Sequence, residues 1–406
     1  MAAPLIVAFA GDLLDAYLVA SHARAGRRVV AVTADAGGDA QALGAAARAL
    51  GADEHVVVDV SDHVWERYVA WLIKGGVTLG AGYPPWPTAE RYAELDLLVA
   101  HARRQGAVEV AHAAGGDDRV LLETALRAVA PDLRLLDVPA APLQARSWLD
   151  EQGLLDRLGA AARRDLGGPE VRAGLWGTTA RGGDLDDPWA TPDDEAFPTV
   201  PAAGDAAALA EEFELEFTQG LPTSSCGAAL EGPDLARQVG KIARRHGVGR
   251  GVHLGEGALG VLGRVAYEAP AAAVLVRAHA ELERLVLTRR QLATKEGLAR
   301  TYGDLFQRGL FHEPLMRDLE RFFESTQRVV TGAVRVRLQR GAVEVVGVRS
   351  PAGLAGPEAW AEAEAVDPRD AGGFARVVAL SGRLARRRDE RSRDAAAPVD
   401  RDDPPA

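Results

Sequence analysis

Short apolar runs alternate with amphipathic helical patterns through the first 140 residues of the chain. Alternation of this kind predicts a parallel β-sheet covered by helices, because each strand leads into a helix that crosses back over the sheet. Ligands bind such sheets beyond the carboxyl ends of the strands. The runs that we interpret as strands span residues 5–9, 29–35, 56–58, 110–112 and 135–137.

The pattern changes in the second half of the chain. Phe213, Leu215 and Phe217 alternate with glutamates, which indicates a half-buried strand. The other elements predicted here are a helix at 235–246, a helical stretch at 271–309 broken near Thr294, a hairpin of 334–338 and 343–348, and a short helix after Gly373.

Two segments read differently from their surroundings. Residues 141–170 are expected to be mostly helical, with a break at 166–169 where two glycines precede a proline. Residues 386–406 are rich in charge and proline and poor in apolar side chains, so we predict disorder there.

Composition narrows the class of protein. A chain of 406 residues with 47% hydrophobic and 26% charged residues is expected to be a globular protein with two domains. The net charge of −11 argues against a nucleic-acid surface. One cysteine, Cys226, suits a reducing cytoplasm, and we expect neither a signal peptide nor a membrane helix. The nine histidines lack ligand spacing, so no transition metal is predicted.

A phosphate-binding loop is expected where the first strand meets the first helix. The chain there reads Ala10-Gly11-Asp12-Leu13-Leu14-Asp15-Ala16, with one glycine, no hydroxyl and two carboxylates. Because a carboxylate beside a polyphosphate costs on the order of 1–4 kcal/mol of Coulomb energy, we predict weak or absent ATP binding. The structural alternative is a plain strand-to-helix turn in which Asp12 caps the helix.

Further motifs run from about Pro4 to about Leu384. They are Tyr83-Pro84, Val110-Ala111-His112, Leu175-Trp176-Gly177, Leu185-Asp186-Asp187-Pro188-Trp189, His246-Gly247-Val248-Gly249-Arg250, Tyr267-Glu268-Ala269-Pro270-Ala271 and Thr331-Gly332-Ala333-Val334. In this order and spacing the chain resembles the argininosuccinate synthase family.

The resemblance implies an α/β fold with an N-terminal Rossmann-like, parallel-sheet nucleotide-binding domain of the ATP-pyrophosphatase type and a C-terminal α+β synthetase and oligomerisation domain. We place these domains at 1–165 and 166–370, followed by a C-terminal helix and disordered tail at 371–406. The family joins citrulline to aspartate in the cytoplasm, using ATP with Mg²⁺ and releasing AMP and pyrophosphate. The resemblance also implies a homotetramer that binds neither nucleic acid nor membrane.

The same resemblance assigns candidate site residues. Nucleotide contacts would come from Ala8, Ala10, Gly11, Asp12, Leu13, Ala34 and Gly115. Amino-acid substrates would contact Tyr83, Thr88, Asp117, Asp118, Thr179 and Tyr267, with Asp118 also the catalytic candidate. The motif at 33–38, which lines the adenine in the family, is largely kept, apart from Gly38 in place of glutamine.

The chain departs from the family pattern at its ligand contacts. Only Gly11 and Leu13 match the family loop Ser-Gly-Gly-Leu-Asp-Thr-Ser. Leu121 stands where the family has an arginine, and an apolar side chain cannot clamp a carboxylate. The remaining departures are Asp117 for asparagine, Glu170 for serine and Gly255 for a citrulline-binding glutamate.

Each candidate also has a purely structural interpretation. Residues 115–118 can be an acidic helix entry, Tyr83 a loop aromatic and Tyr267 a core side chain. Three functions therefore stay open: a working synthase, a ligase for another acid or amine, and a catalytically silent relative that acts as a binding or assembly partner. Nucleotide binding and pyrophosphate release distinguish them.

Overall fold

The computed structural model describes residues 3–35, 40–136, 138, 141–158 and 169–396. The predictions that concern Gly38, the end of the fifth strand at residue 137, the break at 166–168 and disorder at 397–406 lie outside this range. Residues 1–352 form one compact unit and residues 353–406 form another.

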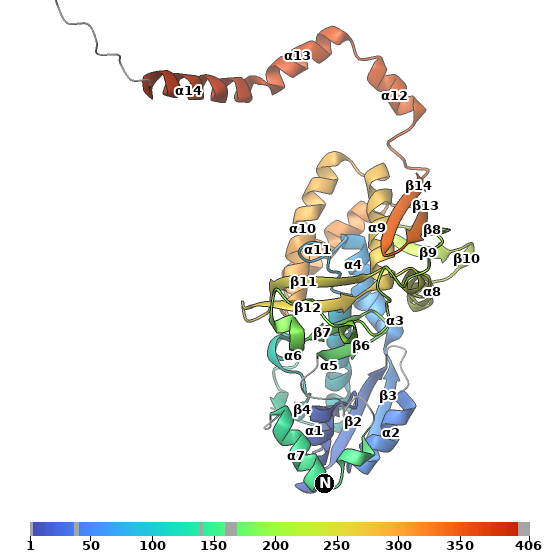
Figure 1. Ribbon diagram of the computed structural model, residues 1–406, viewed down its shortest axis with the longest axis vertical. Helices are drawn as coiled ribbons and strands as arrows, with labels where there is room; N and C mark the ends of the chain where they lie inside the picture. Colours follow the sequence, from blue (N-terminus) through green and yellow to red (C-terminus); the bar gives the residue numbers. More distant parts are fainter. Residues whose placement is uncertain (1–2, 36–39, 137, 139–140, 159–168, 397–406) are drawn as a thin grey trace, which may run out of the picture. The chain divides into compact units, whose positions relative to one another are not determined.

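The chain begins with a five-stranded parallel sheet of order β3-β2-β1-β4-β5, whose first three strands are in the blue part of the ribbon in Figure 1. Its strands are β1 (Leu5–Ala8), β2 (Val29–Asp35), β3 (Glu54–Asp59), β4 (Glu109–Ala111) and β5 (Arg134–Leu136). Its helices are α1 (Leu13–Arg24), α2 (Ala40–Ala49), α3 (Ser61–Val64), α4 (Ala70–Gly75), α5 (Trp86–Gln105), α6 (Gly116–Val129) and α7 (Pro142–Glu151), with a π-helical turn at Trp65–Val69. The predicted parallel sheet is confirmed.

Both faces of this sheet are buried, as the continuous apolar runs require. Leu5 and Val7 on β1 pack with α1 and α7, through residues such as Leu18 and Leu149. The alternate positions, beginning with Ile6, belong to the main core, which includes α5. Alternation of side chains along a strand sends neighbours to opposite faces, so one short run serves two cores.

The second half builds two antiparallel sheets. One has the order β11-β12-β7-β6 and consists of β6 (Glu170–Ala173), β7 (Thr178–Arg181), β11 (Arg250–Glu256) and β12 (Leu262–Glu268). The other has the order β10-β9-β8-β13-β14 and consists of β8 (Glu211–Thr218), β9 (Leu221–Ser225), β10 (Ala228–Ala229), β13 (Gly332–Gln339) and β14 (Ala342–Arg349). The half-buried strand and the hairpin are confirmed.

Helices α8 (Gly232–Arg245), α9 (Pro270–Val286), α10 (Arg289–Gln307) and α11 (Pro314–Gln327) accompany these sheets. The break that we predicted near Thr294 is wrong by six residues. Thr288 instead caps α10, since its hydroxyl accepts from the Gln291 N–H at 3.4 Å and the Gln291 side chain accepts from the Thr288 N–H at 3.0 Å. This reciprocal capping box starts a new helix.

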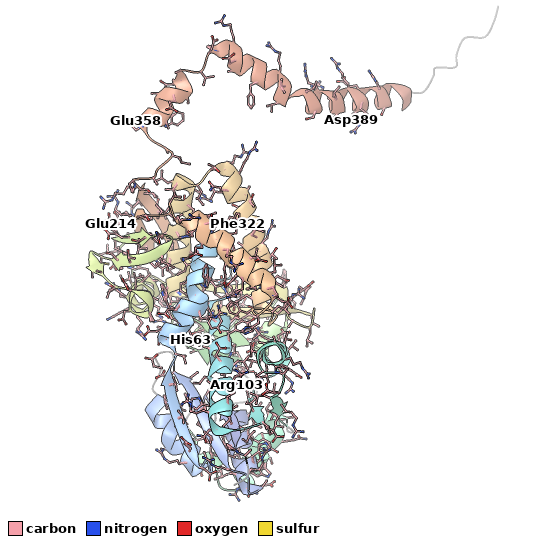
Figure 2. All side chains as sticks on the ribbon, turned by 180° about the vertical axis from the view of Figure 1, so that it is seen from behind. His63, Arg103, Glu214, Phe322, Glu358 and Asp389 are labelled. Atoms are coloured by element: carbon pink, nitrogen blue, oxygen red, sulfur yellow. The ribbon has the colours of Figure 1, made fainter. Side chains whose placement is uncertain are left out.

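The C-terminal unit consists of α12 (Pro357–Glu364), α13 (Pro368–Val378) and α14 (Leu380–Ala396). Neither α12 nor α13 has a buried residue, and Figure 2 shows the side chains of Glu358 and Asp389 extending from α12 and α14. Disorder predicted for residues 386–396 is wrong, because α14 covers them. An i,i+4 ion pair of Arg386 with Glu390 supports that helix.

None of the described helices is both long and apolar enough to cross a lipid bilayer.

Candidate functional site

The loop between β1 and α1 is closed by its own carboxylates. The Asp12 Oδ1 accepts from the Asp15 N–H at 2.8 Å, which caps α1, and the Asp15 Oδ2 accepts from the Ala10 N–H at 2.6 Å. Amides at such a loop are the groups that bind phosphate. Two of them are therefore already engaged within the chain.

Burial makes these carboxylates unusual. Burial raises the pKa of Asp12, against the opposing effect of the hydrogen bond from the Asp15 amide. Burial and the charge of Asp12 raise the pKa of Asp15 well above its usual value. Gly11 has φ of +82°, and a Cβ there would lie 2.4 Å from the Leu43 Cδ2. The loop is thus acidic, self-bonded and covered from the side of α2.

One face of the β11-β12-β7-β6 sheet carries the polar side chains of the candidate site. Directly paired residues of an antiparallel sheet share a face. The register pairs Glu170 with Arg181 and Arg172 with Thr179, and it pairs Thr179 in turn with Tyr267. The same face continues onto β11 as Gly251, His253 and Gly255.

The opposite face of this sheet is apolar. Val171, Ala180 and Ala266 pack there with Leu185 and Phe197. Apolar and polar side chains alternate at positions 170–172 and 179–181. This alternation places the packing residues on one face of the sheet and the polar site residues on the other.

A cavity of about 500 Å³ lies between the polar face of this sheet and the start of α6. We call this polar face, on β6, β7, β12 and β11, the wall of the cavity. Its lining residues are Gly115, Gly116, Asp117, Asp118, Glu170, Arg172, Thr179, Arg181, Leu259, Val261, Leu262 and Gly263. A smaller cavity of about 50 Å³ shares Asp117, Asp118 and Arg181 with it and extends to Tyr83, His253 and Gln307. Four of the predicted residues, Gly115, Asp117, Asp118 and Thr179, are thus brought together.

Ion pairs join the start of α6 to β7 and to α5. The Arg181 Nη1 lies 3.3 Å from the Asp117 Oδ2, and the Asp117 Oδ1 also accepts from the Leu259 N–H at 3.3 Å. The Arg91 Nε lies 3.7 Å from the Asp118 Oδ2. Burial opposes ionisation of Asp118, yet the neighbouring arginines bring its pKa below the usual value. Asp118 is therefore a carboxylate at neutral pH.

Arg172 connects the wall to the first domain. Its Nε lies 3.1 Å from the Glu170 Oε1. Burial opposes its charge, but Asp118, Glu170 and Asp12 outweigh that effect and raise the pKa of the guanidinium. The field of Arg172 thus reaches both the α6 entry and the Asp12 carboxyl of the β1–α1 loop.

The remaining candidates lie elsewhere. Tyr83 is buried and lines the small cavity, where its ring contacts Tyr267 with centroids 4.8 Å apart. The Thr88 hydroxyl donates to the Gln307 Oε1 at 2.8 Å, so it is engaged in a structural hydrogen bond. Of the nucleotide candidates, Ala8 and Leu13 are core residues and Ala34 is partly buried on β2, whereas Ala10 is exposed.

Sequence reasoning did not identify Arg172, Arg181, His253 or Glu90 as parts of the site. The available signal was the alternation of polar residues around 170–172 and 179–181. To infer from this alternation that the two arginines share a face, one needs the pairing register of the strands, which a single sequence does not give.

Glu90 of α5 supports the turn between β6 and β7. Its Oε1 accepts from the Trp176 N–H at 3.1 Å, and a Cβ at Gly174 would lie 2.0 Å from its Oε2. Burial raises its pKa to about 7 from the usual 4.5. The folded state therefore holds this proton more tightly than the unfolded chain does, and the stabilisation is lost as pH rises from about 4.5 through 7.

We expect Glu90→Gln to raise the free energy of unfolding at pH 8 by about 1–3 kcal/mol and to change it little at pH 4.5. Urea unfolding at the two pH values measures this difference. Glu358→Gln, at an exposed position of α12, is the matched control and should show no such dependence on pH. Equal effects of Glu90→Gln at both pH values would contradict the assignment.

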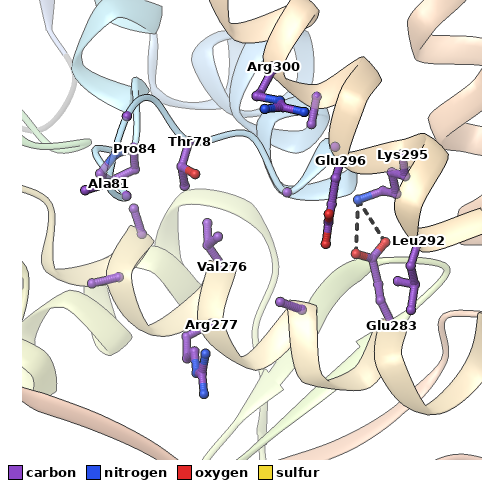
Figure 3. A pocket seen from close by; sticks show the side chains of 18 of the residues that line it. Thr78, Ala81, Pro84, Val276, Arg277, Glu283, Leu292, Lys295, Glu296 and Arg300 are labelled. Carbon is purple, nitrogen blue, oxygen red and sulfur yellow. Dashed lines mark hydrogen bonds and ion pairs between the residues drawn. The ribbon is translucent and has the colours of Figure 1, made fainter. Parts of the chain in front are cut away.

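A further cavity lies away from this site. It has a volume of about 930 Å³ and opens between residues 75–84, α9 and α10. Figure 3 shows Lys295 of α10 bonded to both carboxylate oxygens of Glu283 on α9, at 2.9 and 3.0 Å. Arg277 and Arg300 line the same cavity.

Within the part of the chain that the structure describes, no group of three histidine, cysteine, aspartate or glutamate side chains is arranged to hold a metal ion.

Comparison with known proteins gives consistent matches over almost the whole chain. The model of the arginosuccinate synthase N-terminal HUP domain matches residues 4–152, and that of the arginosuccinate synthase C-terminal domain matches residues 171–385. An argininosuccinate synthase of Dehalococcoides mccartyi is 32% identical over 397 residues, covering 95% of this chain and 96% of its own. That of Methanospirillum hungatei is 33% identical over 370 residues, covering 90% and 92%.

Proposed function

Because the chain belongs to the argininosuccinate synthase family, we propose that it keeps the family's two-domain frame and interdomain cavity but has lost the ATP-dependent ligation of citrulline and aspartate. It is then a catalytically silent member that works as a binding or assembly partner. The observation that carries this proposal is the self-bonded loop, in which Asp12 and Asp15 occupy amides that a phosphate would need.

ATP does not fit this loop on energetic grounds. A polyphosphate must displace the Asp15 carboxyl from the Ala10 amide and leave that buried carboxyl without its donor. Any ionised Asp12 beside it adds repulsion on the order of 1–4 kcal/mol. The loop also lacks the hydroxyl donors that would repay this cost.

The amino-acid cavity supports the same proposal. The two arginines that line it are already paired, Arg181 with Asp117 and Arg172 with Glu170, and its Asp118 is paired with Arg91 of α5. A charged substrate must break such a pair and leave a partly buried charge uncompensated. Leu121 is buried at 3% exposure and offers no charge to replace the clamp.

Calorimetry with ATP and Mg²⁺, followed by pyrophosphate release with citrulline and aspartate, tests the proposal. We expect no saturable ATP binding below millimolar concentration and no pyrophosphate above the protein-free rate. Micromolar ATP affinity with pyrophosphate release would instead establish a working synthase.

A second candidate function is that of a ligase for another acid. The arginines on the polar face of the sheet favour this candidate. Arg172 and Arg181 both face a cavity of about 500 Å³, which is large enough for a small metabolite. Pyrophosphate release that appears only with a different carboxylic acid would support this candidate.

We also propose that the chain assembles as a homotetramer. The C-terminal unit exposes large apolar side chains that a monomer would leave in water, among them Trp360, Phe374 and Val377. Light scattering at micromolar concentration should then give four times the chain mass of 42.9 kDa. A mass of one chain would contradict the assembly.

A further inference from the structure

Strand β11 forms one edge of the β11-β12-β7-β6 sheet. Proteins usually protect such an edge with lysine, proline, a bulge or a very short strand, because an open edge pairs readily with another strand. β11 has seven residues, none of them lysine or proline, and it pairs with β12 without a register shift. Val252 and Leu254 are 44% and 56% exposed on it. Such an edge is typical of a surface that another strand covers.

The backbone groups of alternate β11 residues point away from the sheet. At one end of the β11–β12 pairing, the Ala269 N–H donates to the Gly249 carbonyl at 2.8 Å. At the other end, the Gly257 N–H donates to the Val261 carbonyl at 3.0 Å. Hydrogen-bonded pairs alternate along an antiparallel ladder, so the odd-numbered residues of β11 bond to β12. Four residues turn their backbone groups to the free edge: Arg250, Val252, Leu254 and Glu256.

Within the part of the chain that the structure describes, no backbone hydrogen bond reaches the even-numbered residues of β11 from outside the sheet. Their N–H and C=O groups are therefore available to a further strand. Pairing of this kind supplies affinity through the main chain, and the facing side chains decide which strand fits.

The sequence of β11 is complementary to itself when it is reversed. From Arg250 to Glu256 the chain reads Arg-Gly-Val-His-Leu-Gly-Glu. An antiparallel second copy centred on His253 sets Arg250 opposite Glu256 and lays the glycines opposite each other. Val252 then lies opposite Leu254. Because the axis is twofold, each pair occurs twice, and two ion pairs flank two apolar pairs.

The charges also select the register. Sliding the second strand by two residues in either direction sets both charged residues opposite uncharged ones and loses both ion pairs. A slide by one residue places the side chains of the two strands on opposite faces. The register centred on His253 is the one that satisfies both the charges and the pleat.

The paired side chains continue the apolar face of the sheet. Val252 is paired across β12 with Ala266, which packs in the apolar cluster on that face. Arg250 lies over the Phe197 ring at 3.8 Å, and its Nη2 lies 2.6 Å from the Asp194 Oδ1. A guanidinium has five N–H donors, so Arg250 can bond to a second carboxylate as well.

The centre of the pairing is compatible with close approach. The His253 ring stacks on Tyr83 of its own chain, with centroids 5.0 Å apart. Burial, helped by the charge of Arg181, lowers the pKa of His253 below its ordinary value, so two facing imidazoles are neutral at physiological pH. Gly251 and Gly255 on either side add no side chain to this face.

We propose that β11 is an interface between two copies of this chain, which pair their β11 strands antiparallel about a twofold axis at His253 and so join their sheets into one. A tetramer with dihedral symmetry needs at least two kinds of interface, and β11 supplies one of them. The inference rests on the proposed function only in that copies of the chain associate, and it is independent of whether ATP binds.

Cysteine cross-linking tests this register in the full-length protein, after the native thiol is removed by Cys226→Ser. His253→Cys then sets two thiols opposite each other in a non-hydrogen-bonded pair, with Cα atoms about 4.5 Å apart, within reach of a disulfide. Mild oxidation should convert most of the protein to a covalent dimer. Val252→Cys is the matched control, because the two Val252 Cα atoms would lie more than about 7 Å apart and should stay unlinked.

A charge exchange tests the ion pairs. Glu256→Arg sets like charges opposite each other twice and should weaken self-association at least about tenfold. Adding Arg250→Glu restores opposite charges and should recover most of the affinity. Glu151→Arg, the same change at the exposed end of α7, is the matched control and should leave association unchanged. Sedimentation equilibrium measures association, and thermal unfolding identifies any variant that misfolds.

Three results would overturn the inference: no covalent dimer from His253→Cys, equal cross-linking of Val252→Cys, or unchanged association of folded Glu256→Arg. An assembly that stays unlinked at position 253 would show that the copies meet elsewhere, and the proposed tetramer would still stand. A dimer that links at position 253 but never forms a tetramer would support the inference and contradict the tetramer. ATP calorimetry tests the proposed loss of activity separately.

Discussion

Replacing Lys295 with methionine is expected to lower the free energy of unfolding by about 3–5 kcal/mol, because it leaves the Glu283 carboxylate buried without its cation. Lys295 and Glu283 are 3% and 5% exposed. Glu283 also accepts from the Gln327 Nε2 at 2.6 Å, and the Gln327 Oε1 contacts the His279 Nε2 at 2.8 Å. The loss therefore extends through a buried polar network that joins α9, α10 and α11.

Two further variants test whether the buried charge of Glu283 causes the loss of stability in Lys295→Met. Lys241→Met, at an exposed position of α8, should change stability by less than about 0.5 kcal/mol. Adding Glu283→Gln to Lys295→Met should restore part of the loss, because it removes the uncompensated charge and keeps groups that can bond to Gln327. Urea unfolding measures all three. If Lys295→Met proves as mild as Lys241→Met, the pair contributes little and water reaches Glu283.

The second large effect concerns the β1–α1 loop. Restoring four of the five family residues that this loop lacks, with Ala10→Ser, Asp12→Gly, Leu14→Asp and Asp15→Thr, should increase ATP affinity at least about fivefold, since removal of repulsion on the order of 1–4 kcal/mol corresponds to that factor or more. The same change should cost about 1–2 kcal/mol of stability, because Asp12 caps α1. Pyrophosphate release with citrulline and aspartate should stay absent, because position 121 still lacks an arginine.

Asp12→Asn is the control for the charge alone. Asparagine still caps a helix, so this variant should keep the melting temperature while lowering the repulsion. Calorimetry with ATP and Mg²⁺ measures the ATP affinity of both the four-residue variant and Asp12→Asn. Unchanged affinity in the four-residue variant would show that the obstacle lies outside the loop, for example at Leu43, whose side chain lies against Gly11.

The sequence predicted the parts of the fold whose pattern is local. The strands of the first sheet are short apolar runs followed by helices, and β8 and the β13–β14 hairpin alternate visibly. The start of α10 was misplaced because a capping box at Thr288 outweighs the helical propensity around it. The position of α14 was missed because composition alone suggested disorder.

The site was less accessible to sequence reasoning. Resemblance to the family pointed to Asp118, Thr179 and Tyr83, which the structure places on two adjoining cavities. Arg172 and Arg181 were missed, because their common direction follows from strand pairing between β6 and β7. Likewise the closeness of His253 to Gly255 depends on side-chain packing, since a strand period of two brings them to one face without bringing them into contact.

The two-faced wall has a practical meaning for protein engineering. Positions 172, 179, 181 and 253 share one face, while Val171, Ala180 and Ala266 hold the other against the core. A combinatorial library randomised at the first set alone would sample new binding chemistries without disturbing the apolar residues on which folding depends. The scaffold would thus tolerate wide diversification, and most members of such a library should still be recovered as folded protein.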